Sequence, residues 1–162
     1  MKKNFIWPVI FFFLWLTFSL AAASSLDPDF GWHLKTGEWI WQNRAVPKVD
    51  LFSYTMSDYP WVSAEWLAEV FIYRFYSSWG YVGLAIFFGL IAAVTFWLVK
   101  GPVKKAGFFA PLLLASLAEA DYMAVRPKMF GLLFAGVSFW LLGQSRKRPK
   151  MLLALPIVFL FW

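Results

Sequence analysis

Long apolar runs alternate with short polar segments along the 162 residues of this chain. A helix that crosses a lipid bilayer needs about 20 mostly apolar residues, because its backbone polar groups must be satisfied within the segment. Four runs come near that length and a fifth stops at the last residue: 5–23, 81–99, 106–125, 127–143 and 151–162. The pattern predicts an all-α integral membrane protein of about five spans. Because the fifth run is too short to cross, we expect either the N-terminal part of a longer protein or a short re-entrant segment.

The composition agrees with a membrane protein better than with a soluble one. Hydrophobic residues make up 61% of the chain and charged residues 15%, whereas soluble domains are roughly half apolar and a quarter charged. The net charge of +6 does not indicate nucleic acid, because the basic residues lie beside apolar runs rather than on a soluble module. Cysteine is absent, which excludes a disulfide framework and a thiol nucleophile. We therefore expect the lipid bilayer as a partner and no nucleic acid.

The distribution of charge predicts the orientation of the spans. Short cytoplasmic loops retain positive charge, and serial threading of the runs puts three basic clusters on one side: Lys2 and Lys3; Lys100, Lys104 and Lys105; Arg146, Lys147, Arg148 and Lys150. The nine acidic residues then lie on the other side. The N terminus is expected to be cytoplasmic and the segment 24–80 to be an external loop.

The first run has a competing interpretation as a cleaved signal peptide. Basic residues precede its apolar core, and the small residues at 21–24 could serve for cleavage. Its length and its content of Phe and Trp favour a retained span instead.

The external loop carries the signals of two amphipathic helices that lie on the membrane surface. The first is predicted to begin with Asp27 as its cap and Pro28 in its first turn. One of its faces is expected to carry Leu34, Gly37 and Trp41. The second is predicted near 63–80, and the segment 46–60 between them is irregular and rich in turn-forming residues.

A motif directly follows the first run and reads Asp27-Pro28-Asp29-Phe30-Gly31-Trp32-His33-Leu34. Further positions that belong to the same pattern are Gly37, Ile40, Pro47, Asp50, Phe52-Ser53-Tyr54-Thr55, Trp61 and Glu65-Trp66-Leu67. This pattern resembles a bacterial branch of the GT-C superfamily of membrane glycosyltransferases, which carry an acidic motif just beyond the first span. It departs from the better-known branches, which favour an Asp-Glu pair at this place. This chain has Asp27 and Asp29 instead, separated by a proline.

The resemblance implies a GT-C-like multi-span helical bundle in a bacterial inner membrane. It further implies transfer of a sugar from a polyprenyl-phosphate donor to an acceptor at the outer face. Such a reaction needs a carboxylate that acts as general base or holds a divalent cation, and Asp27 and Asp29 are the catalytic candidates. The candidates for substrate binding are His33, Glu65, Glu119, Asp121, Arg126 and Lys128. Of these, Arg126 and Lys128 would meet the donor phosphate.

Each candidate also has an interpretation without chemistry. Asp27 could do no more than cap a helix, which is worth about 1 kcal/mol. The lone His33 could be a packed interface residue, and Glu65 and Glu69 could form a solvated helix face. Glu119 or Asp121 could pair with Arg126, since ionisable groups near lipid usually have a partner.

Two other classes of function remain open on the sequence alone. The first is a non-catalytic scaffold or assembly subunit whose external loop docks a partner. The second is a transporter of a lipid-linked glycan. Convergence of Asp27, Asp29, Glu119 and Arg126 on one cavity would favour the enzyme.

Overall fold

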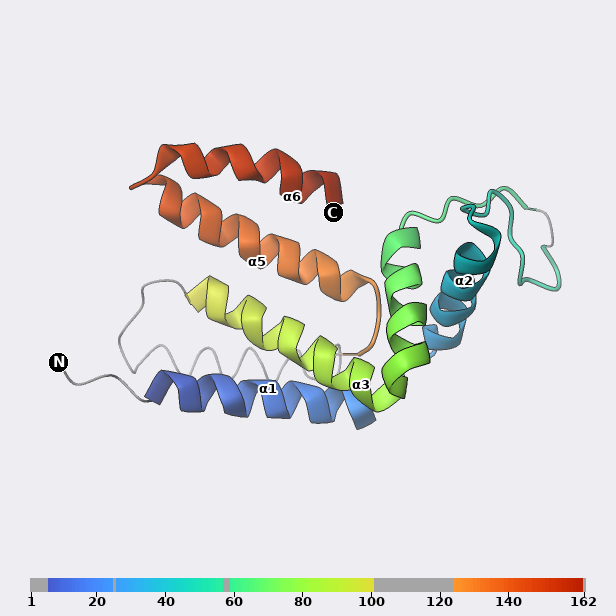
Figure 1. The fold of residues 1–162 in the computed structure, drawn as a ribbon, viewed down its shortest axis with the longest axis horizontal. Helices are drawn as coiled ribbons and strands as arrows, with labels where there is room; N and C mark the ends of the chain where they lie inside the picture. The colour runs from blue at the N-terminus through green and yellow to red at the C-terminus, as the bar shows by residue number, and fades with distance from the viewer. Residues whose placement is uncertain (1–5, 25, 57–58, 101–123, 162) are drawn as a thin grey trace. The chain divides into compact units, whose positions relative to one another are not determined.

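A computed structural model describes residues 6–24, 26–56, 59–100 and 124–161 of the chain. In these residues the secondary structure is helical, apart from one isolated β-bridge between Val49 and Pro60. The chain divides into two compact units, one formed by residues 28–84 and the other by 1–27 together with 85–162. Figure 1 shows the helices in chain order. Each unit is described separately below.

Two helices form the centre of the unit that contains both ends of the chain. Helix α1, Ile6–Ser24, packs along the part of α3, Trp66–Lys100, that follows residue 84. Phe18 of α1 is fully buried and stacks on Phe96, with ring centroids 5.2 Å apart. Gly89 lets the two backbones approach closely, because a Cβ atom there would lie 2.6 Å from the backbone nitrogen of Ser19.

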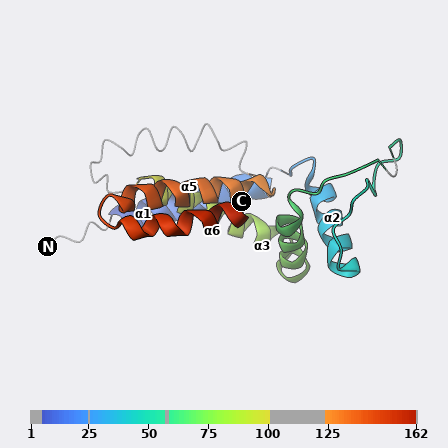
Figure 2. The same ribbon diagram turned by 90° about the horizontal axis from the view of Figure 1, so that it is seen from above.

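Helix α5, Lys128–Ser145, packs on the same part of α3. The rings of Phe88 and Phe130 meet edge to face at 5.6 Å, and Gly136 faces Thr95 closely enough that a Cβ atom would lie 2.9 Å from Cγ2. The chain then turns back along α5 through the 3₁₀ helix η3, Pro149–Ala154, and helix α6, Leu155–Phe161. Figure 2 shows α5 and α6 lying side by side.

Two helices among the described residues are long and apolar enough to cross a membrane, Trp7–Ser24 and Trp66–Val99. They contain the predicted spans 5–23, from residue 7 on, and 81–99. The predicted span 127–143 corresponds to α5, from Lys128 on. The segment 151–162 forms η3 and α6, and the span 106–125 lies almost wholly outside the described residues. A bundle of about five spans stays a prediction.

The other unit packs helix α2, Phe30–Asn43, against the N-terminal part of α3. Gly37 is the contact point. A Cβ atom at this position would overlap the backbone carbonyl group of Glu69 and lie 2.5 Å from its carbon. Phe30 packs against the rings of Tyr76 and Tyr81. The close approach at position 37 therefore determines which side chains of the two helices meet.

The predicted start of the first loop helix is wrong in detail. Helix α2 begins at Phe30, after Asp29 as N-cap, and this aspartate makes no side-chain capping hydrogen bond. Asp27 does not cap the helix, because its carboxylate is buried in an ion pair elsewhere. The buried positions of α2 are Phe30, Thr36, Gly37 and Ile40, so that Gly37 is the one buried member of the predicted face of Leu34, Gly37 and Trp41.

The second predicted loop helix and the second span form one element, α3, with a break at Gly80. This glycine has φ 65° and ψ −172°, a backbone conformation that residues with a side chain rarely adopt. The predicted boundary at residue 80 is therefore confirmed as a change of direction in the helix.

Between the helices, the described residues 44–56 and 59–65 of the connector are irregular, which agrees with the irregular segment predicted at 46–60. The Asp50 carboxylate accepts hydrogen bonds from the backbone N–H groups of Phe52 and Ser53 at 2.9 and 3.0 Å. Hydrogen bonds from the Ser53 side chain and from these N–H groups lower the pKa of the Asp50 carboxyl. The connector is thus ordered by its own side chains at this turn.

Candidate functional site

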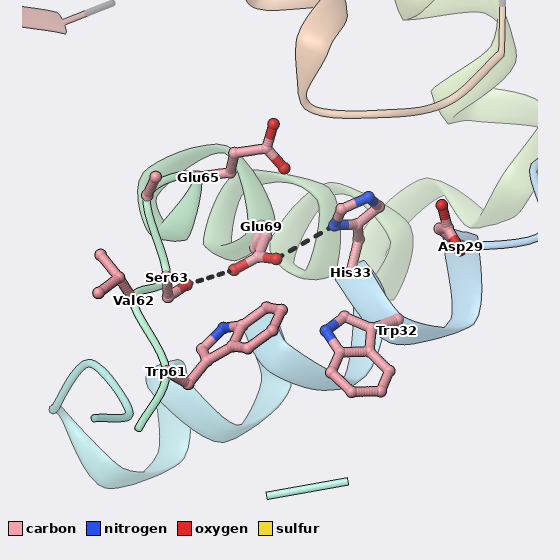
Figure 3. Close-up of a pocket in the computed structure, with 9 residues that line it drawn as sticks. Asp29, Trp32, His33, Trp61, Val62, Ser63, Glu65 and Glu69 are labelled. Carbon is pink, nitrogen blue, oxygen red and sulfur yellow. Dashed lines mark hydrogen bonds and ion pairs between the residues drawn. The ribbon is translucent and has the colours of Figure 1, made fainter. Parts of the chain in front are cut away.

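An open pocket of about 500 Å³ lies within the unit formed by residues 28–84. Figure 3 shows its lining side chains, which are Asp29, Trp32, His33, Trp61, Val62, Ser63, Ala64, Glu65 and Glu69. They come from the beginning of α2, from the end of the connector and from the beginning of α3. The pocket thus combines carboxylates, an imidazole and two indole rings.

The packing of α2 on α3 places the imidazole against a carboxylate. His33 lies one turn before Gly37 on α2, and Gly37 contacts the Glu69 backbone. As a result, Nδ1 of His33 lies 3.1 Å from Oε1 of Glu69. A carboxylate only accepts hydrogen bonds, so the imidazole donates in this contact.

Glu69 is buried at 5% exposure, although the sequence predicts it on a solvated helix face. Burial of a carboxylate is costly unless its oxygens are bonded. Both oxygens have a partner, since His33 bonds Oε1 and the Ser63 hydroxyl donates to Oε2 at 3.0 Å. The interpretation of Glu69 as a solvated residue is therefore wrong. These bonds fix the side chain in one orientation at the pocket.

Glu65 is exposed and directly precedes α3. Its backbone carbonyl accepts the N–H of Glu69, so the two glutamates stand one helical turn apart. One ligand atom each from His33, Glu65 and Glu69 can be chosen so that all three lie within 4.8 Å of one another. Figure 3 shows the Glu65 carboxylate on the same side of α3 as the imidazole.

An aromatic wall completes the pocket. The rings of Trp32 and Trp61 have centroids 5.9 Å apart with 52° between their planes, and Phe52 packs edge to face on Trp32 at 5.5 Å. The Trp61 backbone N–H donates to the Lys48 carbonyl at 2.9 Å, next to the bridge between Val49 and Pro60. The connector therefore holds Trp61 in place opposite α2.

Asp27, which belongs to the other unit, forms an ion pair with Arg126. The Asp27 side chain is 1% exposed and that of Arg126 is 26% exposed. The pair joins the end of α1 to the segment before α5. It gives Asp27 a structural role other than capping, and it gives Arg126 a partner other than the predicted Glu119 or Asp121.

The remaining predicted site residues are Asp29, Lys128, Glu119 and Asp121. Asp29 lines the pocket with His33 and Glu65. Lys128 is the exposed first residue of α5. Glu119 and Asp121 lie outside the described residues.

Sequence reasoning missed the roles of Ser63 and Glu69. The signal that points to them is the spacing of Glu65 and Glu69 one turn apart behind a serine, together with a histidine on the preceding helix. It also missed the placement of Arg44 and Arg74, whose guanidinium groups lie 4.2 and 4.3 Å from the centroid of the Trp41 ring.

Comparison of the chain with protein-family models, with curated proteins and with solved structures finds no significant match.

Proposed function

We propose that this chain belongs to a GT-C-type membrane glycosyltransferase, which transfers a sugar from a polyprenyl-phosphate donor to an acceptor at the outer face of a bacterial inner membrane. The observation that carries the proposal is the pocket, where carboxylates and an imidazole stand beside two tryptophans. A sugar ring has an apolar face of C–H groups that packs on an indole ring, and hydroxyl groups that bond to carboxylates. The pocket offers both kinds of contact.

The apolar helices support a location at the membrane. Trp7–Ser24 precedes the pocket residues in the chain, and Trp66–Val99 begins among them. Two such helices would anchor the chain in a bilayer. A donor with a lipid part would then be held in the same membrane as the chain.

Asp29 is the residue that we assign as general base. It is exposed, lines the pocket and stands at the beginning of α2. In the transfer, its carboxylate accepts the proton of the acceptor hydroxyl, and the acceptor oxygen forms a bond to the anomeric carbon. The bond between that carbon and the phosphate oxygen breaks, and its electron pair leaves on the polyprenyl phosphate.

Asp27 is better explained as a structural residue than as the general base. Its ion pair with Arg126 already neutralises the carboxylate, which is withdrawn from solvent. Lys128 is exposed and belongs to the other unit, so its role in binding the donor phosphate stays a prediction from the sequence.

The test is turnover of undecaprenyl-phosphate hexoses by the full-length protein in proteoliposomes, measured as release of undecaprenyl phosphate. We expect Asp29→Asn to lower the rate about a hundredfold or more, the scale for loss of a general base. Glu38→Gln is the matched control, because Glu38 pairs with Lys35 on the same helix and does not line the pocket.

Two outcomes would contradict the proposal. Full turnover in Asp29→Asn would contradict the assignment of Asp29 as the general base. No turnover of any hexose donor by the wild-type protein would favour the non-catalytic scaffold.

A further inference from the structure

We propose that His33, Glu65 and Glu69 bind a divalent transition-metal cation, of the kind of Zn²⁺ or Mn²⁺, in the pocket. The site is defined by three side chains from two helical segments (Figure 3). The proposal stands on their geometry and does not require that the chain transfers sugars.

The spacing of the three groups is close to that of a coordination shell. Protein ligands about 2.0–2.2 Å from a tetrahedral Zn²⁺ lie roughly 3.4 Å from one another. Nδ1 of His33 and Oε1 of Glu69 are 3.1 Å apart, and one ligand atom from each of the three residues can be chosen so that all three lie within 4.8 Å of one another. The proton that Nδ1 donates to Glu69 passes to solvent when a cation takes its place. The Glu65 side chain is exposed, so it is the least constrained of the three ligands.

The ligand types select the class of cation. One imidazole nitrogen with two carboxylate oxygens suits Zn²⁺, Mn²⁺ and Fe²⁺, whereas Mg²⁺ and Ca²⁺ prefer oxygen ligands alone. Three protein ligands leave at least one coordination position vacant. Because the three side chains line an open pocket, that position is accessible to water or to a ligand hydroxyl, which is typical of catalytic rather than structural sites.

The buried ligand is held in place before any cation binds. The Ser63 hydroxyl donates to Oε2 of Glu69, which leaves Oε1 directed toward His33. Hydrogen bonds of this kind orient metal ligands, and their loss costs about 10- to 100-fold in affinity. The contact of Gly37 with the Glu69 backbone fixes the distance between the two helices at the same point.

The test is calorimetric titration of the full chain in detergent micelles with ZnCl₂, after treatment with EDTA. The result expected is one equivalent of Zn²⁺ per chain. Glu65→Gln should weaken binding at least about tenfold, since a direct ligand should matter no less than its hydrogen-bond partners. Glu38→Gln, a carboxylate on α2 that does not line the pocket, should bind Zn²⁺ as the wild type does.

Glu65 is the decisive position because its side chain is exposed, so that Glu65→Gln should fold normally. Circular dichroism checks this, and His33→Ala then gives a second measurement from the other helix. The proposal is overturned if the wild type binds no zinc stoichiometrically, if Glu65→Gln binds as tightly as the wild type, or if Glu38→Gln weakens binding equally. The titration contains no sugar donor. A failure here with normal turnover of donor would therefore remove the metal site and leave the proposed function intact.

Discussion

Gly37→Ala tests whether the contact between α2 and α3 builds the pocket. The new methyl group would overlap the Glu69 carbonyl group, at 2.5 Å from its carbon. The obstructing atoms belong to the backbone, so the helices must separate, and overpacking of this kind costs about 1–3 kcal/mol. Replacing a helical glycine by alanine returns up to about 1 kcal/mol of helix propensity. With the full gain in helix propensity, we expect a net loss of up to about 2 kcal/mol, together with a longer contact between His33 and Glu69.

Gly31→Ala is the matched control, because a Cβ atom there meets nothing within 4 Å and the residue lies on the same helix. It should leave stability unchanged or raise it by a few tenths of a kcal/mol. The assay is thermal unfolding of both variants in detergent, with circular dichroism and the fluorescence of the pocket tryptophans. A Gly37→Ala protein as stable as Gly31→Ala would refute the close contact and with it the explanation of how the pocket forms.

Three further predictions concern single contacts elsewhere in the chain. Asp27→Ala should destabilise the protein by about 1–3 kcal/mol, because it leaves the partly buried guanidinium of Arg126 without its carboxylate. Thermal unfolding in detergent measures this, and an unchanged melting temperature would contradict the ion pair. Gly89→Ala should push α1 away from α3, since the methyl group would meet the Ser19 backbone. We expect the variant to have a lower melting temperature than the wild type. The hydrogen bonds from Ser53 and neighbouring N–H groups lower the pKa of the Asp50 carboxyl. Their contribution to the stability of the folded state is therefore present above about pH 4 and is lost as the pH falls through the lowered pKa. Chemical shifts of the connector amides should follow this titration in the wild type but not in Asp50→Ala.

The sequence predicted the helices well because apolar length and local signals decide them. The runs at 5–23 and 81–99 correspond to described helices, and the boundary near residue 80 follows from a glycine that can leave the helical conformation. The two helices predicted within segment 24–80 were also placed within a few residues. These features depend on interactions between near neighbours in the chain.

The partners of the charged groups could not be predicted, because they depend on contacts between distant segments. His33 and Glu69 are 36 residues apart, and the periodicity of either helix gives no information about the other. Glu69 looks like a solvated residue until Ser63 and His33 are seen to satisfy both of its oxygens. Asp27 likewise looks like a helix cap until Arg126 is seen beside it.

The most direct test of the central claim is donor protection of a cysteine placed in the pocket. The native chain has no cysteine, so Val62→Cys in the pocket lining and Tyr54→Cys, at 99% exposure outside it, provide a matched pair. On intact cells, we expect both to react with a membrane-impermeant maleimide. In proteoliposomes, undecaprenyl-phosphate hexose should slow the labelling of Val62→Cys and leave that of Tyr54→Cys unchanged. Labelling of neither cysteine before permeabilisation, or equal labelling rates with and without the donor at Val62→Cys, would contradict an external sugar-binding pocket.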